Sequence, residues 1–100
     1  MTFEDHVRRA LDSLPPELAR GLENVAVVVE DENPEEPDLL GLFDEQPYLP
    51  AKISIYRRPL VEDFGDDAAE LEREIRVTVL HELAHYFGID EERLEELGYD

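Results

Sequence analysis

Two histidines, His81 and His85, stand four residues apart in the sequence HELAH, with Glu82 directly after the first. In an α-helix this spacing turns the two side chains by only about 40° around the axis, so both rings can reach one metal ion. A catalytic zinc takes three protein ligands and leaves one position for water, whose pKa falls toward about 7. Glu82 lies on the shoulder of the same helix face and can accept the proton of that water. The pattern therefore predicts a zinc-dependent hydrolase with Glu82 as the general base.

The motif needs a helix that carries it and ends soon after it. Residues 66–87 are strong helix formers with acids at their start, and Gly88 is typical of a helix end. A chain that reverses at Gly88 can return a following side chain to the metal, whereas a continuing helix would carry that side chain away. Apolar side chains occupy much of the circumference of the predicted helix between residues 77 and 87, so we expect other elements to enclose that segment almost completely.

The same residues also allow a purely structural interpretation. His81 and His85 are then ordinary polar residues at the edge of a packed helix, and Glu82 pairs with an arginine. His6, the third histidine, stands alone on a predicted first helix, and we expect it to be exposed. Because short motifs also arise by chance, the metal interpretation depends on the helix and on its glycine stop.

The rest of the chain predicts the elements that support this helix. A first helix spans residues 2–14, with Thr2 as its N-cap and Asp5 three residues later, and a short last helix lies within residues 90–98. The β-branched residues 25–29 predict a buried strand, and residues 39–43 predict a short one.

The segment KISIYRR, residues 52–58, predicts a strand with one buried face. Its isoleucines alternate with polar residues and Pro59 ends it, a pattern that suits the edge of a sheet. Arg57 and Arg58 either pair with neighbouring acids or hold a carboxylate or oxyanion of a substrate.

The composition limits the partners. The 27 acidic residues outnumber the 9 lysines and arginines, and the net charge of -18 repels phosphate backbones and anionic membranes. We therefore expect neither nucleic acid nor a membrane as a partner. Cysteine is absent, so a zinc site must be built from histidines and carboxylates. With no signal peptide or membrane-spanning segment in view, we expect one soluble cytoplasmic domain over residues 1–100.

The segment HELAHYFGIDEERLEELGY, together with LLGLF and ISIYRRPL upstream, resembles the small zincin-like metallopeptidases, whose motif reads H-E-x-x-H-x-x-G-x-x-D. The resemblance spans residues 25–99 and implies a minimal zincin-like fold of the α+β class. Such a fold has a small mixed sheet of about three or four strands, a backing helix, a long active-site helix and a short C-terminal helix.

The resemblance also implies the third metal ligand. The last aspartate of the family motif falls on Glu91, which is longer by one methylene, so we expect His81, His85 and Glu91 to hold Zn²⁺. The acids around Glu91 remain alternatives: Asp90, Glu92 and Glu95.

The implied activity is hydrolysis of peptide bonds in a peptide or protein substrate by a zinc-activated water. Zincins pair an extended peptide with an edge strand above the active-site helix, and KISIYRR supplies the candidates for this role: Ile53, Ser54 and Ile55. Tyr99 is a further substrate-binding candidate, while we expect Tyr86 to pack against the core. The alternative function is a catalytically inactive domain that acts as a peptide or protein interaction module.

Overall fold

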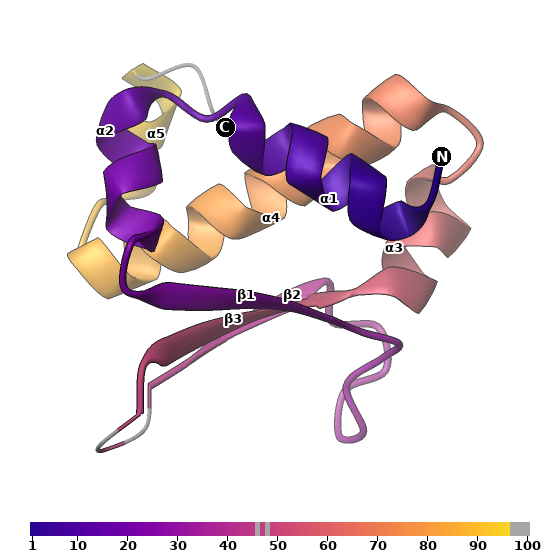
Figure 1. Cartoon of the computed structure of the whole chain (residues 1–100), viewed down its shortest axis with the longest axis horizontal. Coiled ribbons are helices and arrows are strands. Elements are labelled where there is room, and N and C mark those ends of the chain that lie inside the picture. Colours follow the sequence, from indigo (N-terminus) through magenta and orange to yellow (C-terminus); the bar gives the residue numbers. More distant parts are fainter. Residues whose placement is uncertain (46, 48, 97–100) are drawn as a thin grey trace.

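The computed structural model describes residues 1–45, 47 and 49–96, apart from the side chains at positions 91 and 94. A layer of helices covers one face of a three-stranded sheet (Figure 1). The elements in chain order are α1 (Phe3–Asp12), α2 (Pro16–Ala19), the 3₁₀-helix η1 (Arg20–Leu22), β1 (Val25–Glu30), β2 (Gly41–Asp44), β3 (Ala51–Tyr56), α3 (Arg57–Phe64), α4 (Ala68–Phe87) and α5 (Glu91–Glu96). The predicted α+β class with a small mixed sheet and a long helix is confirmed.

Strand β3 occupies the centre of the sheet, in the order β1-β3-β2. It runs parallel to β1 and antiparallel to β2, and Ile53 pairs with Val27 on one side and Phe43 on the other. The predicted edge position of this strand is therefore wrong. The alternating pattern misleads because the polar residues of β3 are covered too. Ser54 and Tyr56 are buried, and the Tyr56 hydroxyl accepts a hydrogen bond from Asn33 at 3.0 Å.

Helix α3 begins directly after β3 and was not expected from the sequence. The strand ends at Tyr56 and not at Pro59 as expected. Pro59 lies in the first turn of α3, where the N–H groups have no helical acceptor, so a proline costs no hydrogen bond there. Leu60 anchors the helix and is fully buried.

Helix α1 packs on α4 and begins with the predicted cap. Thr2 and Asp5 form a capping box, in which the Asp5 N–H donates to the Thr2 hydroxyl and the Thr2 N–H donates to the Asp5 carboxylate. The bond from the Thr2 N–H holds the pKa of Asp5 below its usual value. The expected exposure of His6 is wrong, since its Nδ1 lies 2.5 Å from Glu72 Oε2 on α4 and its side chain is only 13% exposed.

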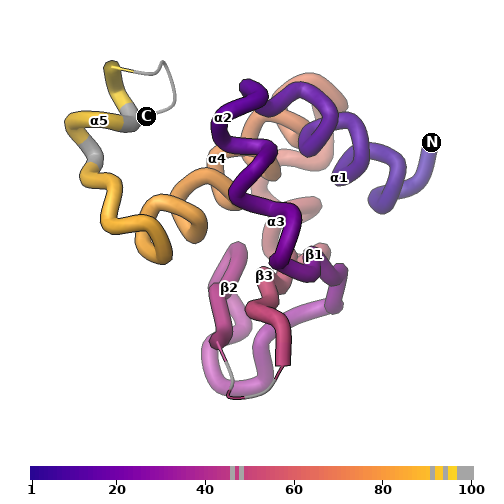
Figure 2. The backbone as a smooth tube through the Cα atoms, turned by 60° about the vertical axis from the view of Figure 1, so that its left-hand side comes forward, coloured from indigo at the N-terminus to yellow at the C-terminus, as the bar shows by residue number. Residues whose placement is uncertain are grey.

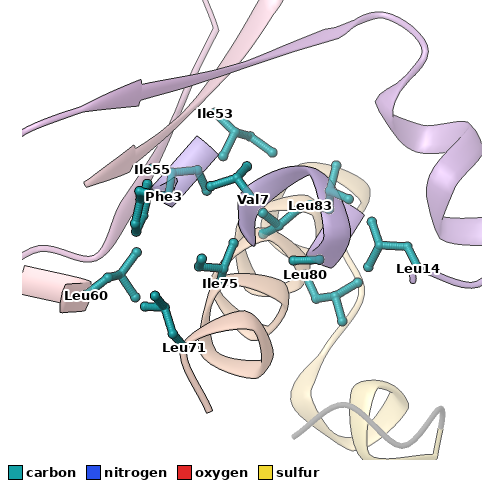
Figure 3. Close-up of a cluster of buried hydrophobic side chains, with 12 residues drawn as sticks. Phe3, Val7, Leu14, Ile53, Ile55, Leu60, Leu71, Ile75, Leu80 and Leu83 are labelled. Atoms are coloured by element: carbon teal, nitrogen blue, oxygen red, sulfur yellow. The ribbon is translucent and has the colours of Figure 1, made fainter. Parts of the chain in front are cut away.

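One apolar cluster joins α1, β3, α3 and α4 (Figure 3). Ile75 and Val79 of α4 are fully buried against Ile53 and Ile55 of the sheet layer, and burying each such side chain contributes about 1.5–3 kcal/mol. The burial of α4 ends at Ala84, so the expected enclosure to residue 87 is wrong for its last turn. Among the described helices, neither α4 nor any other is long and apolar enough to cross a membrane.

Candidate metal centre

Helix α4 carries the histidine motif in its last two turns. Its start is fixed by Asp67, whose carboxylate accepts hydrogen bonds from the N–H groups of Ala69 at 2.9 Å and Glu70 at 3.3 Å. From this cap the helix runs unbroken for 20 residues to Phe87. The predicted helix and its end are therefore confirmed, and the HELAH segment has the helical geometry that its spacing requires.

The two histidines occupy one face of α4, near the end of the helix that the core leaves uncovered. His81 is half-buried and His85 is exposed, and of the three residues between them Leu83 and Ala84 face the core. Within the described residues neither imidazole ring is engaged in an ion pair or hydrogen bond with another side chain. Both rings are therefore available as ligands one helical turn apart.

Gly88 ends the helix in the way the sequence predicts. Its backbone is left-handed, with φ 68° and ψ 26°, a conformation that favours glycine. The Ile89 N–H donates to the Ala84 carbonyl at 2.8 Å and the Gly88 N–H donates to the His85 carbonyl at 3.4 Å. These two bonds form a Schellman motif, which turns the chain sharply away from the helix axis just after the motif.

The acids that follow Gly88 begin the last helix. The Asp90 carboxylate accepts a hydrogen bond from the Arg93 N–H at 2.9 Å, so Asp90 caps α5. Glu92 and Glu95 are exposed. Glu91 is the first residue of α5, but its side chain lies outside the described residues, as does Tyr99.

No three histidine, aspartate or glutamate side chains that could hold a metal ion gather anywhere in the described part of the chain. The side chain of Glu91, the expected third ligand, lies outside that part. The described donors on the motif helix are thus the pair His81 and His85.

Glu82 points toward the sheet, where its carboxylate accepts a hydrogen bond from the main-chain N–H of Phe43 at 3.1 Å. Phe43 lies on β2, an edge strand whose described partner in the sheet is β3. The structural interpretation predicted that Glu82 pairs with an arginine. Within the described residues it pairs with none and links the motif helix to the edge of the sheet instead.

Strand β2 and helix α4 meet along a seam of five residues: Gly41, Phe43, Thr78, Glu82 and Tyr86. At one end, a β-carbon placed on Gly41 would lie 2.5 Å from Cγ2 of Thr78, far inside normal contact. At the other end, the rings of Phe43 and Tyr86 stack with their centroids 4.7 Å apart. Tyr86 packs against Phe43 at the sheet edge and not against the core as expected, and 43% of its surface is exposed. Figure 2 shows the C-terminal half of α4 on the β2 side of the sheet.

The sequence reasoning missed Gly41 and Phe43 as members of the site. A glycine inside the expected strand of residues 39–43 signals a close approach of another element, and this was the one available sign. Nothing in the sequence identifies the Phe43 N–H as a partner of Glu82, because every residue other than proline carries the same group.

The expected substrate-binding residues of β3 do not lie where a peptide can pair with them. Ile53 and Ile55 have no exposed surface, and Ser54 is 3% exposed. Both edges of their strand are already bonded, to β1 and to β2. The edge that adjoins the motif helix belongs instead to β2.

The two arginines after β3 pair with acids, which is one of the two roles that the sequence allows. Arg57 binds Asp31, and Arg58 lies 3.0 Å from Glu32 and 2.8 Å from Glu62. The hydrogen bond to Glu62 is the main cause that raises the pKa of Arg58 above its usual value. Both side chains thereby fasten the loop after β1 to the start of α3.

Comparison with known proteins places this site in a protein family. A comparison with curated proteins found no match to the chain. The family model described as zincin-like metallopeptidase matches residues 22–99, which include the whole sheet, the motif helix and the helix that follows it. The chain therefore belongs to the zincin-like metallopeptidase family.

Proposed function

We propose that the protein is a zinc-dependent peptidase that hydrolyses peptide bonds in peptide or protein substrates. The observation that carries this proposal is the arrangement of His81, Glu82 and His85 on the last two turns of α4, closed by the left-handed turn at Gly88. Membership in a family of metallopeptidases supports it.

The donors on α4 suit zinc. Two imidazoles one turn apart are ligands that zinc accepts at roughly 2.0–2.1 Å, and a third oxygen ligand would complete a catalytic set. Glu91 is our candidate for that ligand, because the Schellman turn at Gly88 starts α5 within a few residues of His85. The carboxylate of Asp90 is already used as the cap of α5, which favours Glu91 over its neighbour.

Zinc bound there would act as a Lewis acid that lowers the pKa of a water molecule toward about 7. Glu82 supplies the chain's own part of the reaction. Its carboxylate takes a proton from the attacking water and can return it to the leaving amine. His81 and His85 would each hold the metal through the lone pair of a ring nitrogen.

The substrate would lie along β2. This strand is the sheet edge next to α4, and an extended peptide can add to the main-chain groups of such an edge, here apart from the Phe43 N–H that Glu82 accepts. The net charge of -18 favours substrates with basic residues. This replaces the expected pairing with Ile53, Ser54 and Ile55.

The test replaces Glu82 with glutamine and compares that variant with a Glu74→Gln control. Glu74 is half-buried on the histidine face of α4 two turns earlier and bonds to Arg73 at 3.0 Å. We expect E82Q to keep its zinc content and to lose turnover of a casein or basic-peptide substrate by roughly a hundredfold or more, the usual range for a general base. E74Q should keep both properties.

Full peptidase activity in zinc-loaded E82Q would contradict the proposal. If neither wild type nor E82Q cleaves any peptide but both bind one with equal affinity, the domain is instead an interaction module.

A further inference from the structure

We infer that the main-chain N–H of Phe43 is a positioning group for Glu82, and that Gly41 is the residue that makes this possible. The inference rests on the proposed role of Glu82 and adds to it two residues outside the histidine motif. It follows from the seam of Gly41, Phe43, Thr78, Glu82 and Tyr86 between β2 and α4.

The hydrogen bond from Phe43 fixes the carboxylate of Glu82 on the sheet side of α4. A glutamate side chain on a helix surface has three rotatable bonds before its carboxylate, and each must be restrained before the group has one position. The N–H of Phe43 reaches Glu82 Oε2 at 3.1 Å, and this N–H belongs to an edge strand that β3 does not cover on that side. An outward-facing N–H on an edge strand has no partner within the sheet. The carboxylate of Glu82 supplies the acceptor for the Phe43 N–H.

The bond needs β2 to lie unusually close to α4, and Gly41 provides that closeness. A β-carbon at Gly41 would stand 2.5 Å from Thr78 Cγ2, 3.2 Å from the Ser54 carbonyl oxygen and 4.0 Å from Glu82 Cγ. Any other residue at this position would push the strand away from the helix at Thr78, one turn before Glu82. The Phe43 N–H, two residues along the same strand, would then move out of hydrogen-bonding range.

The aromatic stack holds the other side of the same contact. Tyr86 follows Glu82 by one helical turn, and its ring lies on Phe43 with a centroid separation of 4.7 Å. Phe43 thus contacts α4 twice, through its main chain at Glu82 and through its ring at Tyr86. Glu82 is held between two fixed contacts, Gly41 on Thr78 and Phe43 on Tyr86.

The first experiment measures hydrogen exchange of the Phe43 amide by NMR in the metal-free protein, so its result does not depend on catalysis. Glu82→Ala removes the acceptor of the Phe43 N–H. The Phe43 amide should then exchange faster by on the order of tenfold or more, because a hydrogen bond to a charged group is lost. Glu82→Gln keeps an acceptor oxygen and should retain most of the protection. Glu74→Ala, on the same helix, should leave the Phe43 amide unchanged.

The second experiment tests Gly41 by compensation. Gly41→Ala adds only a methyl group, and alanine is no worse than glycine in a strand, so loss of protection at Phe43 would report the clash with Thr78. Thr78→Ser removes the methyl group that is struck but keeps the hydroxyl, which donates to the Glu74 carbonyl at 2.8 Å. The double variant G41A/T78S should therefore recover part of the slow exchange of Phe43, because the contact of 3.2 Å with the Ser54 carbonyl oxygen remains.

With zinc present, G41A should show a reduced kcat, with partial recovery in G41A/T78S. Equal exchange of Phe43 in wild type and E82A would overturn the inference, and so would equal loss of protection in E74A. If G41A does not fold, the E82A and E82Q comparison alone decides. If no variant and no wild type cleaves peptide while the exchange pattern is as expected, the proposed function fails and the positioning of Glu82 stands.

Discussion

Replacement of Gly88 with alanine tests the turn that closes the histidine helix. At φ 68° a residue with a β-carbon is strained, and the left-handed conformation costs an L-residue about 1–2 kcal/mol. A β-carbon on Gly88 would meet none of the described atoms within 4 Å, so the cost is backbone strain and not a clash. Alanine also reduces the entropy of the unfolded chain, which offsets part of that strain. We expect a net loss of about 1 kcal/mol in the free energy of unfolding.

The assay is urea unfolding of metal-free protein, with thermal unfolding as a second measure. A loss of about 1 kcal/mol corresponds to a decrease of roughly 4–8 °C in Tm for a domain of this size. Gly88→Asn is the matched control, because asparagine tolerates the left-handed region better than alanine does. Its loss should be clearly smaller. Equal stability of wild type and G88A, with unchanged m-values, would refute the left-handed turn and with it the path from His85 to α5.

Two further predictions concern the helices that support the site. The lowered pKa of Asp5 means that its carboxylate adds stability to the capping box while it is ionised. Asp5→Asn should therefore lower the free energy of unfolding near pH 7, and the difference from wild type should shrink as pH falls through the lowered folded-state pKa, below about 3.9. A difference that persists unchanged at pH 2 would contradict this origin. Ile75→Ala should lower the free energy of unfolding, measured with urea, by about 2–5 kcal/mol because Ile75 is fully buried. Val77→Ala, at a half-buried position, should lower it clearly less, and similar losses in the two variants would contradict the packing of α4.

The helices of the site could be predicted because their signals are local. The Thr2 cap, the helix formers of residues 66–87 and the glycine at position 88 each act within one or two turns, and all three appear in the structure. The helical spacing of His81 and His85 follows from the same local rule. These features need no knowledge of what packs against them.

The features that the sequence did not reveal depend on contacts between distant segments. The alternation in β3 indicated one buried face, but the loop residue Asn33 covers Tyr56 on the other face, and pairing on both sides makes the strand central. The expectation that His6 is exposed failed because its partner, Glu72, lies 66 positions away, and no local pattern reveals such a pair. The bond between Phe43 and Glu82 is of the same kind, since 39 positions separate the two residues.

Zinc titration of the metal-free protein tests the proposed centre most directly, with binding followed by calorimetry and by Tm. Wild type should bind about one zinc per chain and unfold at a higher temperature when zinc is present, because a ligand that binds only the folded state stabilises it. His85→Ala should lose this binding, while His6→Ala, which removes a histidine paired with Glu72 far from the motif, should keep it. Zinc binding by H85A with wild-type affinity, or no zinc-dependent shift in wild type, would contradict the assignment of His81 and His85 as metal ligands.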